Sequence, residues 1–248
     1  MFPLRVNLRR LHAPIVTIVL ILVNAVVFFH EISLPHAVLD RFLDTYGLVP
    51  AHYLAALTHA PTRLDLWLVP LFASMFIHGG WLHIGGNMLY LWVFGSILEG
   101  RMGRVRFLVF YLLAGLLAAH TQVLLTPTST LPMIGASGAI SGVMGGFLLV
   151  FPLARVEVLI LIVIIPIFFE LPAILFLGIW ALQQFLYGAM FALSRTAARG
   201  SDIAVWAHAG GFVTGMLLVL PFLGRRQRSH LRAHYRHPLA QWHGDRGV

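Results

Sequence analysis

Long apolar runs without a charged residue dominate the pattern of this chain. A helix that crosses a bilayer needs about 20 mostly apolar residues. Five uncharged runs reach that length: 11–30, 66–98, 107–154, 171–194 and 203–224. The second run contains one crossing after the Gly79-Gly80 pair, and the third has room for two crossings around the turn-rich stretch 126–135. The pattern therefore predicts six transmembrane helices.

One further apolar segment, 158–169, is too short to cross a membrane alone. It holds 12 residues, contains Pro166 and lies between Glu157 and Glu170. We interpret this segment as a re-entrant or interfacial piece. The arginines support leaving this segment out of the count of crossings, because the arginines near both ends of the chain are expected on the cytoplasmic side. Two cytoplasmic ends require an even number of crossings.

The composition agrees with a multi-pass membrane protein and excludes a soluble one. Hydrophobic residues make up 59% of the chain, charged residues make up 10%, and the mean hydropathy is +0.85. The chain has no cysteine, which excludes disulfides, thiolate metal sites and thiol nucleophiles. Its net charge of +8 comes from arginines that gather between apolar runs, so we attribute the charge to topology and not to nucleic-acid binding. We expect a bacterial cytoplasmic membrane, with both termini cytoplasmic.

These runs divide the chain into three parts and predict an all-α integral membrane fold. Residues 1–13 form a cytoplasmic N-terminal segment, and residues 14–224 form the six-span domain. Residues 225–248 form a basic cytoplasmic tail that we expect to be disordered. A long outer loop, residues 31–80, connects the first and second helices.

Placing a polar side chain inside a bilayer costs free energy, so the polar side chains in the predicted helices are candidates for function. Four of them stand out: His83, Asn87, Ser137 and His208. Each has a structural alternative, because serine and histidine also serve helix packing and interhelical hydrogen bonds in membranes. We therefore use the sequence around each residue to choose between a functional and a structural role.

Ser137 lies in Gly135-Ala136-Ser137-Gly138, at the start of the predicted fourth helix, which Pro152 ends. From Ser137 to Phe151 a helix rises about 21 Å, whereas the hydrocarbon core is about 30 Å thick. The helix therefore starts below the outer surface, and the chain before it must line a water-filled pit. The free amide hydrogens at its N-terminus favour an oxyanion beside the serine. We interpret Ser137 as a nucleophile in a site that opens to the outer side.

His208 is expected near the outer end of the sixth helix, at the same depth as Ser137. Small residues on the fourth and sixth helices allow close approach of the two backbones. The packing residues are Gly138, Gly142, Gly211 and Gly215. Close approach would let His208 accept the proton of Ser137 as a general base. Because Asp202 falls six residues earlier, in a loop, no carboxylate is placed to orient the imidazole, and we expect a dyad.

His83 and Asn87 are spaced four residues apart on the second helix, so their side chains face the same way. Both side chains can donate hydrogen bonds. With the Ser137 amide they could complete an oxyanion hole. Interhelical hydrogen bonding is the structural alternative for this pair.

Together these motifs resemble the rhomboid family of intramembrane serine proteases, from Pro14 to Leu220. The similar stretches are 75–83 with Asn87, Gly135-Ala136-Ser137-Gly138, and Ala207-His208 with Gly211 and Gly215. The resemblance implies Ser137 as the nucleophile, His208 as the base, and His83 with Asn87 as oxyanion donors. It implies no metal or nucleotide cofactor. The implied substrates are single-span membrane proteins, cut in or near their transmembrane segment.

The chain departs from the family pattern at two places. Val69 and Pro70 stand where some members have a Trp-Arg pair, and Trp67 is the candidate substitute for that anchor. Ser141 stands where many members have a tyrosine that stacks on the catalytic histidine, so another aromatic ring or the glycine contact would position His208. Neither change removes a reacting group. The stretch 99–103 also resembles the family and has an implied structural role.

Three functions remain open at this point. The first is a peptide-bond hydrolase that works through an acyl-enzyme. The second is a catalytically silent protein of the same fold that binds transmembrane helices without cutting them. The third is a small-solute transporter, but many transporters contain two similar halves, and this chain has no internal repeat. The sequence does not determine the oligomeric state.

Overall fold

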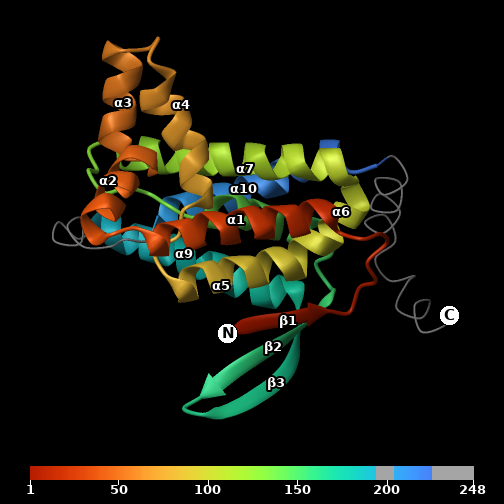
Figure 1. Cartoon of the computed structure of the whole chain (residues 1–248). Coiled ribbons are helices and arrows are strands. Elements are labelled where there is room, and N and C mark those ends of the chain that lie inside the picture. Colours follow the sequence, from red (N-terminus) through yellow and green to blue (C-terminus); the bar gives the residue numbers. More distant parts are fainter. Residues whose placement is uncertain (194–203, 225–248) are drawn as a thin grey trace.

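The computed structural model describes residues 1–193 and 204–224, and helices make up most of it (Figure 1). The apolar helices are α1 (Ile15–Ser33), α5 (Trp81–Tyr90), α6 (Ser96–Met102), α7 (Arg104–Leu125), α8 (Ser137–Val150), α9 (Ala173–Leu193) and α10 (Val205–Phe222). A π-type turn, η2 (Leu91–Gly95), joins α5 to α6. Figure 1 shows α1, α5, α7 and α10 running side by side. The predicted helical membrane architecture is therefore confirmed in outline.

Four helices in the described part of the chain are long and apolar enough to cross a membrane: α1, α7, α9 and α10. A fifth crossing arises if Leu64–Phe76 and Trp81–Met102, which meet at an angle of 81°, form one broken span. α8 is apolar but has only 14 residues. Each predicted span thus has a helix in its place. The predicted number of six crossings is not confirmed by length and composition.

The connection between α1 and α5 is helical, which corrects the prediction of a long loop. It contains α2 (His36–Tyr46), α3 (Pro50–His59), α4 (Leu64–Ala73) and the 3₁₀ turn η1 (Ser74–Phe76). Pro50 is the first residue of α3, a position that proline favours because its φ angle suits a helix and its missing N–H needs no partner there. Figure 1 shows α3 and α4 standing off one end of the bundle. Charges rule out a crossing here but do not prevent short amphipathic helices.

A three-stranded antiparallel sheet corrects the prediction of an all-α fold. β2 (Arg155–Ile162) and β3 (Ile165–Pro172) form a hairpin, and β1 (Phe2–Val6) pairs with the other edge of β2. The hairpin contains the segment 158–169, which we interpreted as a re-entrant or interfacial piece. Valine and isoleucine dominate this segment, and β-branched residues favour strands. A segment too short for a spanning helix is long enough for two paired strands.

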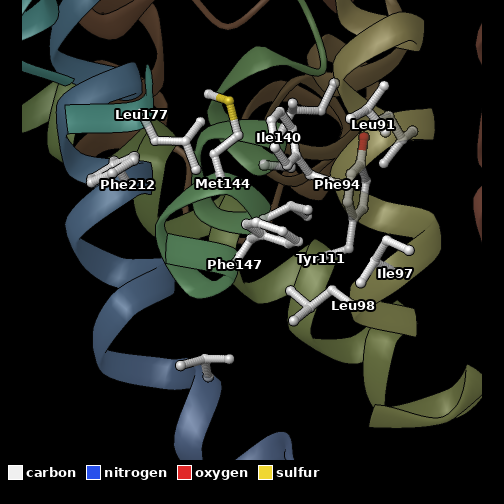
Figure 2. Packing of buried hydrophobic residues seen from close by; sticks show 14 of the residues in the cluster. Leu91, Phe94, Ile97, Leu98, Tyr111, Ile140, Met144, Phe147, Leu177 and Phe212 are labelled. Atoms are coloured by element: carbon white, nitrogen blue, oxygen red, sulfur yellow. The ribbon is translucent and has the colours of Figure 1, made fainter. Parts of the chain in front are cut away.

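The core surrounds α8, and apolar side chains of the neighbouring helices pack against it. Figure 2 shows Met144 between Phe212 of α10 and Phe94 of η2. The rings of Phe94 and Phe147 meet edge to face, with centroids 5.0 Å apart. Because α8 is enclosed in this way, the packing fixes the position of its first residue.

Glu99, near the end of α6, holds the start of α1. Its buried carboxylate accepts hydrogen bonds from the backbone N–H groups of Val16 (3.0 Å) and Thr17 (2.8 Å) and from Thr17 Oγ1 (2.8 Å). The first N–H groups of a helix have no partner within the helix. Glu99 therefore caps α1 from another helix, which is a structural role.

Candidate active site

Ser137 is the first residue of α8, which has 14 residues, against 22 in α7 and 18 in α10. The prediction of a short helix that starts at this serine is confirmed. The preceding loop turns at Gly135, whose φ of +119° is strained for a residue with a side chain. The Gly135 N–H donates to the Ser74 carbonyl oxygen at 2.8 Å, which fixes the turn.

Gly135 also leaves room for an imidazole. A Cβ built at this position would lie 2.7 Å from His83 Nε2 and 3.6 Å from Ser137 Oγ. Both contacts belong to the same small space beside the loop. The absence of a side chain at position 135 therefore lets His83 of α5 approach the start of α8.

Ser137 and His208 are in direct contact. Ser137 Oγ lies 2.7 Å from His208 Nε2, which is hydrogen-bond distance. His208 lies in the first turn of α10, where the Ala207 N–H donates to Gln122 Oε1 of α7 at 3.0 Å. This bond from α7 fixes the start of α10 next to α8.

The four packing glycines named from the sequence lie at the contact between α8 and α10. A Cβ on Gly211 would overlap the Gly138 carbonyl oxygen, and a Cβ on Gly215 would overlap that of Gly142. The two backbones touch, as small residues allow in membrane proteins. The distance between Ser137 and His208 depends on this contact, because both side chains project from the same pair of helices.

His83 presents a hydrogen-bond donor to the loop that precedes Ser137. Its Nδ1 accepts a hydrogen bond from the Gly79 N–H at 3.3 Å, so the neutral ring carries its proton on Nε2. Nε2 is the ring atom nearest to the Cβ position of residue 135. The tautomer that the Gly79 contact selects therefore carries its N–H on the side of residue 135, next to the start of α8.

Asn87 lies one turn further along α5 and is 8% exposed. Its Nδ2 is buried without a hydrogen-bond partner among the described residues, and the side chain lines the same cavity as Ser137. Buried amide donors are almost always satisfied in proteins. An unpaired donor at this place is suited to an oxygen atom of a ligand.

All four candidate side chains line one cavity of about 660 Å³ between α5, α8, α9 and α10. Ser141, also on its wall, is fully buried and donates from Oγ to the Ser137 carbonyl oxygen at 2.6 Å. Within the described ranges, no group of three or more His, Cys, Asp or Glu side chains could hold a metal ion. The cavity thus combines an alcohol, an imidazole and two amide or imidazole donors.

Two residues of α9 that sequence reasoning missed complete the surroundings of His208. Gln184 Oε1 lies 2.8 Å from His208 Nδ1. The Trp180 ring lies 6.0 Å from the imidazole, centroid to centroid, and provides the aromatic contact that Ser141 cannot. Residues four apart share a helix face, and a polar residue within an apolar run was the signal that could have found Gln184. Asp202 lies outside the described residues.

Comparison with known proteins points to one family. The model of the Rhomboid domain matches residues 65–225, which include the four candidate residues. Rhomboid protein 1, mitochondrial, of Saccharomyces cerevisiae is 30% identical over 181 residues, which are 71% of this chain and 45% of that protein. Rhomboid-like protease 3 of Toxoplasma gondii is 29% identical over 165 residues, 66% of this chain and 55% of that protein.

A bacterial relative matches over a shorter stretch. Rhomboid protease GluP of Bacillus subtilis is 38% identical over 80 residues, which are 32% of this chain and 15% of that protein. In all three comparisons the chain spans less than two thirds of the relative's own length.

Proposed function

Because this chain belongs to the rhomboid family of integral membrane proteins, we propose that it is an intramembrane serine endopeptidase. In this proposal Ser137 is the nucleophile and His208 is the general base. The observation that carries it is the 2.7 Å contact between Ser137 Oγ and His208 Nε2 on the wall of a cavity. Two of the three relatives described above are named proteases, which also supports the proposal.

The proposed reaction proceeds through an acyl-enzyme. Ser137 Oγ forms a bond to the carbonyl carbon of the substrate peptide while its proton passes to His208 Nε2. The carbon–nitrogen bond then breaks, and the leaving amine takes that proton. A water molecule repeats the sequence on the ester, which releases the carboxylic acid product and restores Ser137.

An oxyanion forms in each of the two addition steps, and three donors are available for it. They are the backbone N–H of Ser137 at the start of α8, His83 Nε2 and Asn87 Nδ2. Donors that are fixed before the reaction stabilise the developing charge without reorganisation. This provides a chemical reason for the unpaired amide of Asn87.

We also propose six crossings, with α8 as a short span and α5 with η2 and α6 as one span. Arginines at 9, 10, 104 and 155 then lie on the cytoplasmic side together with both termini, and the start of α8 lies toward the outer side. The cavity is walled by helices of the membrane domain. Single-span membrane proteins whose helix unwinds near the cleavage point are therefore the proposed substrates.

Labelling of the nucleophile tests the proposal. Purified protein in detergent is treated with a fluorophosphonate, and the modified residue is identified by mass spectrometry. We expect the label on Ser137 and its loss in the Ser137→Ala and His208→Ala variants. Ser141→Ala is the matched control, because it removes a hydroxyl from the same helix one turn later, and it should label like the wild type.

Equal labelling of the wild type and Ser137→Ala, with both folded, would show that Ser137 is not the nucleophile. Capture of a single-span membrane protein that survives Ser137→Ala, without any cleavage product from the wild type, would favour a silent binder of transmembrane helices.

A further inference from the structure

We propose that Gln184 is a positioning residue that fixes the tautomer and orientation of His208. This inference rests on the proposed function, because it assigns the partner that prepares the general base. The geometry that carries it is a continuous chain of contacts across the imidazole. Nδ1 lies 2.8 Å from Gln184 Oε1, and Nε2 lies 2.7 Å from Ser137 Oγ.

The chemistry of an amide oxygen sets the direction of this chain. Gln184 Oε1 has lone pairs and no hydrogen, so its contact requires the proton of the neutral imidazole on Nδ1. Nε2 then carries the lone pair that accepts the Ser137 proton. The opposite tautomer would present N–H to the hydroxyl and could not act as a base.

Gln184 differs from a carboxylate in carrying no charge. It can orient the ring, but it cannot stabilise the imidazolium by a full negative charge. Trp180, one turn earlier on α9, lies beside the same ring at 6.0 Å. The two side chains hold His208 from one helix, and α8 approaches it from the other side.

The ionisable groups that face His208 are few, which makes a pH profile interpretable. His83 and Tyr90 of α5 line the same cavity, and Gln122 of α7, which contacts the preceding residue, is uncharged. Gln184 and Trp180, which come from α9, are also uncharged. Of these ionisable groups, His208 is the one with a hydrogen bond to Gln184, so we assign a change in the pH profile after substitution of Gln184 to His208.

The test compares Gln184→Met, Gln184→Glu and the matched control Gln183→Met by initial rates of cleavage across pH. Gln183 is an exposed neighbour on α9, so its substitution makes the same chemical change away from the imidazole. We expect Gln184→Met to lower kcat about tenfold, with KM changed less than about twofold, since part of the general-base contribution is lost. Gln183→Met should match the wild type.

The Gln184→Glu variant tests the pH dependence of cleavage, which would not change if Gln184 had only a structural role. A carboxylate at this position stabilises the imidazolium, so His208 should become protonated at a higher pH than in the wild type. The acid side of the activity profile should shift to higher pH, while activity on the alkaline side is retained. Wild-type rates and profiles in both Gln184 variants would overturn the positioning role. Absence of Ser137-dependent cleavage in the wild type would instead overturn the proposed function.

A second inference comes from the opposite end of the bundle. We infer that Arg5, Arg9 and Arg10 form a binding site for the headgroup phosphate of an anionic phospholipid. The three side chains line a separate cavity of about 360 Å³, with Val93 and Ile97 on its apolar wall. This cavity does not share a residue with the candidate active site.

Two of the three arginines, all of which are exposed residues, have a partner within the protein. The Arg10 guanidinium lies 4.2 Å above the Trp92 ring centre, and its Nε donates to Ser96 Oγ at 3.0 Å. Arg5 pairs with Glu157 of β2. Arg9 makes no ion pair with any residue that the structure describes, so its charge is available.

The position of the cavity favours a membrane lipid as its ligand. α1 begins at Ile15, five residues after Arg10, so the cavity lies where the first helix enters the membrane. Guanidinium groups bind phosphate through two parallel hydrogen bonds, and basic pockets beside transmembrane helices hold lipid headgroups. The apolar wall can accept the first carbons of the acyl chains.

Native mass spectrometry of the protein in detergent, titrated with phosphatidylglycerol, phosphatidylcholine or inorganic phosphate, tests this site. Arg9→Gln should weaken phosphatidylglycerol binding at least about fivefold, and Arg9→Gln with Arg10→Gln should weaken it further. Arg104→Gln is the control, since it removes an exposed charge outside the cavity. Equal binding of phosphatidylcholine, equal binding of inorganic phosphate, or undiminished binding by the double variant would overturn the inference.

Discussion

At the scale of single residues, Asn87 offers the sharpest test of the proposed oxyanion hole. Its Nδ2 has no partner among the described residues, so Asn87→Ala removes a donor that stabilises no other group of the fold. We expect kcat to fall about 100- to 1,000-fold, the usual effect of losing one oxyanion donor. Steady-state cleavage of a single-span substrate in detergent measures this change.

The stability of the same variant serves as its control. Because no hydrogen bond to Nδ2 is lost, the unfolding temperature of Asn87→Ala should stay within a few degrees of the wild type. A folded variant that cleaves within about threefold of the wild-type rate would contradict a catalytic role for Asn87.

Single residues differ in how far the sequence could identify them. Ser137, His208, His83 and Asn87 are polar residues within apolar runs, and their motifs order them along the chain. Gln184 has the same polar character, but its importance depends on how α9 is rotated about its axis relative to His208. Helical periodicity places Gln184 and Trp180 on one face but does not say which neighbour that face meets. Only the packing of α9 against α10 supplies this information.

At the scale of elements, the contact between α8 and α10 should tolerate no side chain at its glycines. A Cβ on Gly215 would overlap the backbone of Gly142, and neither backbone can move without disturbing the core. We expect Gly215→Ala to lower the free energy of unfolding by about 1–3 kcal/mol, the usual cost of overpacking. Thermal unfolding in detergent measures this loss.

Gly178→Ala is the matched control for this substitution. A Cβ on Gly178 of α9 would have no neighbouring atom within 4 Å, and alanine favours a helix over glycine by up to about 1 kcal/mol. The control should therefore be as stable as the wild type or slightly more stable. Equal stability of Gly215→Ala and Gly178→Ala would show that α8 and α10 are not in backbone contact.

The junction of α6 and α1 gives a second prediction at this scale. Both carboxylate oxygens of Glu99 accept hydrogen bonds from Val16 and Thr17. In Glu99→Gln an NH₂ group replaces one of these oxygens and faces a donor. We expect a loss of about 2 kcal/mol in thermal unfolding. Glu157→Gln, which breaks an ion pair with an exposed arginine, should cost less than about 1 kcal/mol. Equal losses in the two variants would contradict the capping role of Glu99.

The three strands were not predicted because neither their turn nor their pairing is marked by a local sequence pattern. The hairpin of β2 and β3 turns at Val163 and Ile164, without the asparagine or glycine that marks a two-residue turn. Val163 even adopts a φ of +57°, which is uncommon for a β-branched residue. Partner β1 lies about 150 residues away in sequence, so no local pattern could indicate the pairing. The long helices α1, α7, α9 and α10 were predicted because a crossing needs about 20 mostly apolar residues, which is a local property of the sequence.

At the scale of the whole molecule, the distribution of arginines and the short helix α8 imply a topology that geometry alone does not fix. If α8 crosses the membrane, the loop before it and the turn after it lie on opposite sides. Thr128 and Leu153 are exposed residues in these two connections. The chain has no cysteine, so a single introduced cysteine at either position gives labelling without background.

We predict that a membrane-impermeant maleimide labels Thr128→Cys from the outer side of right-side-out vesicles. Leu153→Cys should be labelled only in inverted vesicles or after permeabilisation, because the arginines near it favour the cytoplasmic side. The physical reason is that 14 residues suffice for a crossing when the chain before them lines a polar cavity and need not meet lipid. Labelling of both positions from the same side would mean that α8 does not span. The start of α8 would then face the side on which α8 ends, and six crossings with an outward-opening site would be impossible.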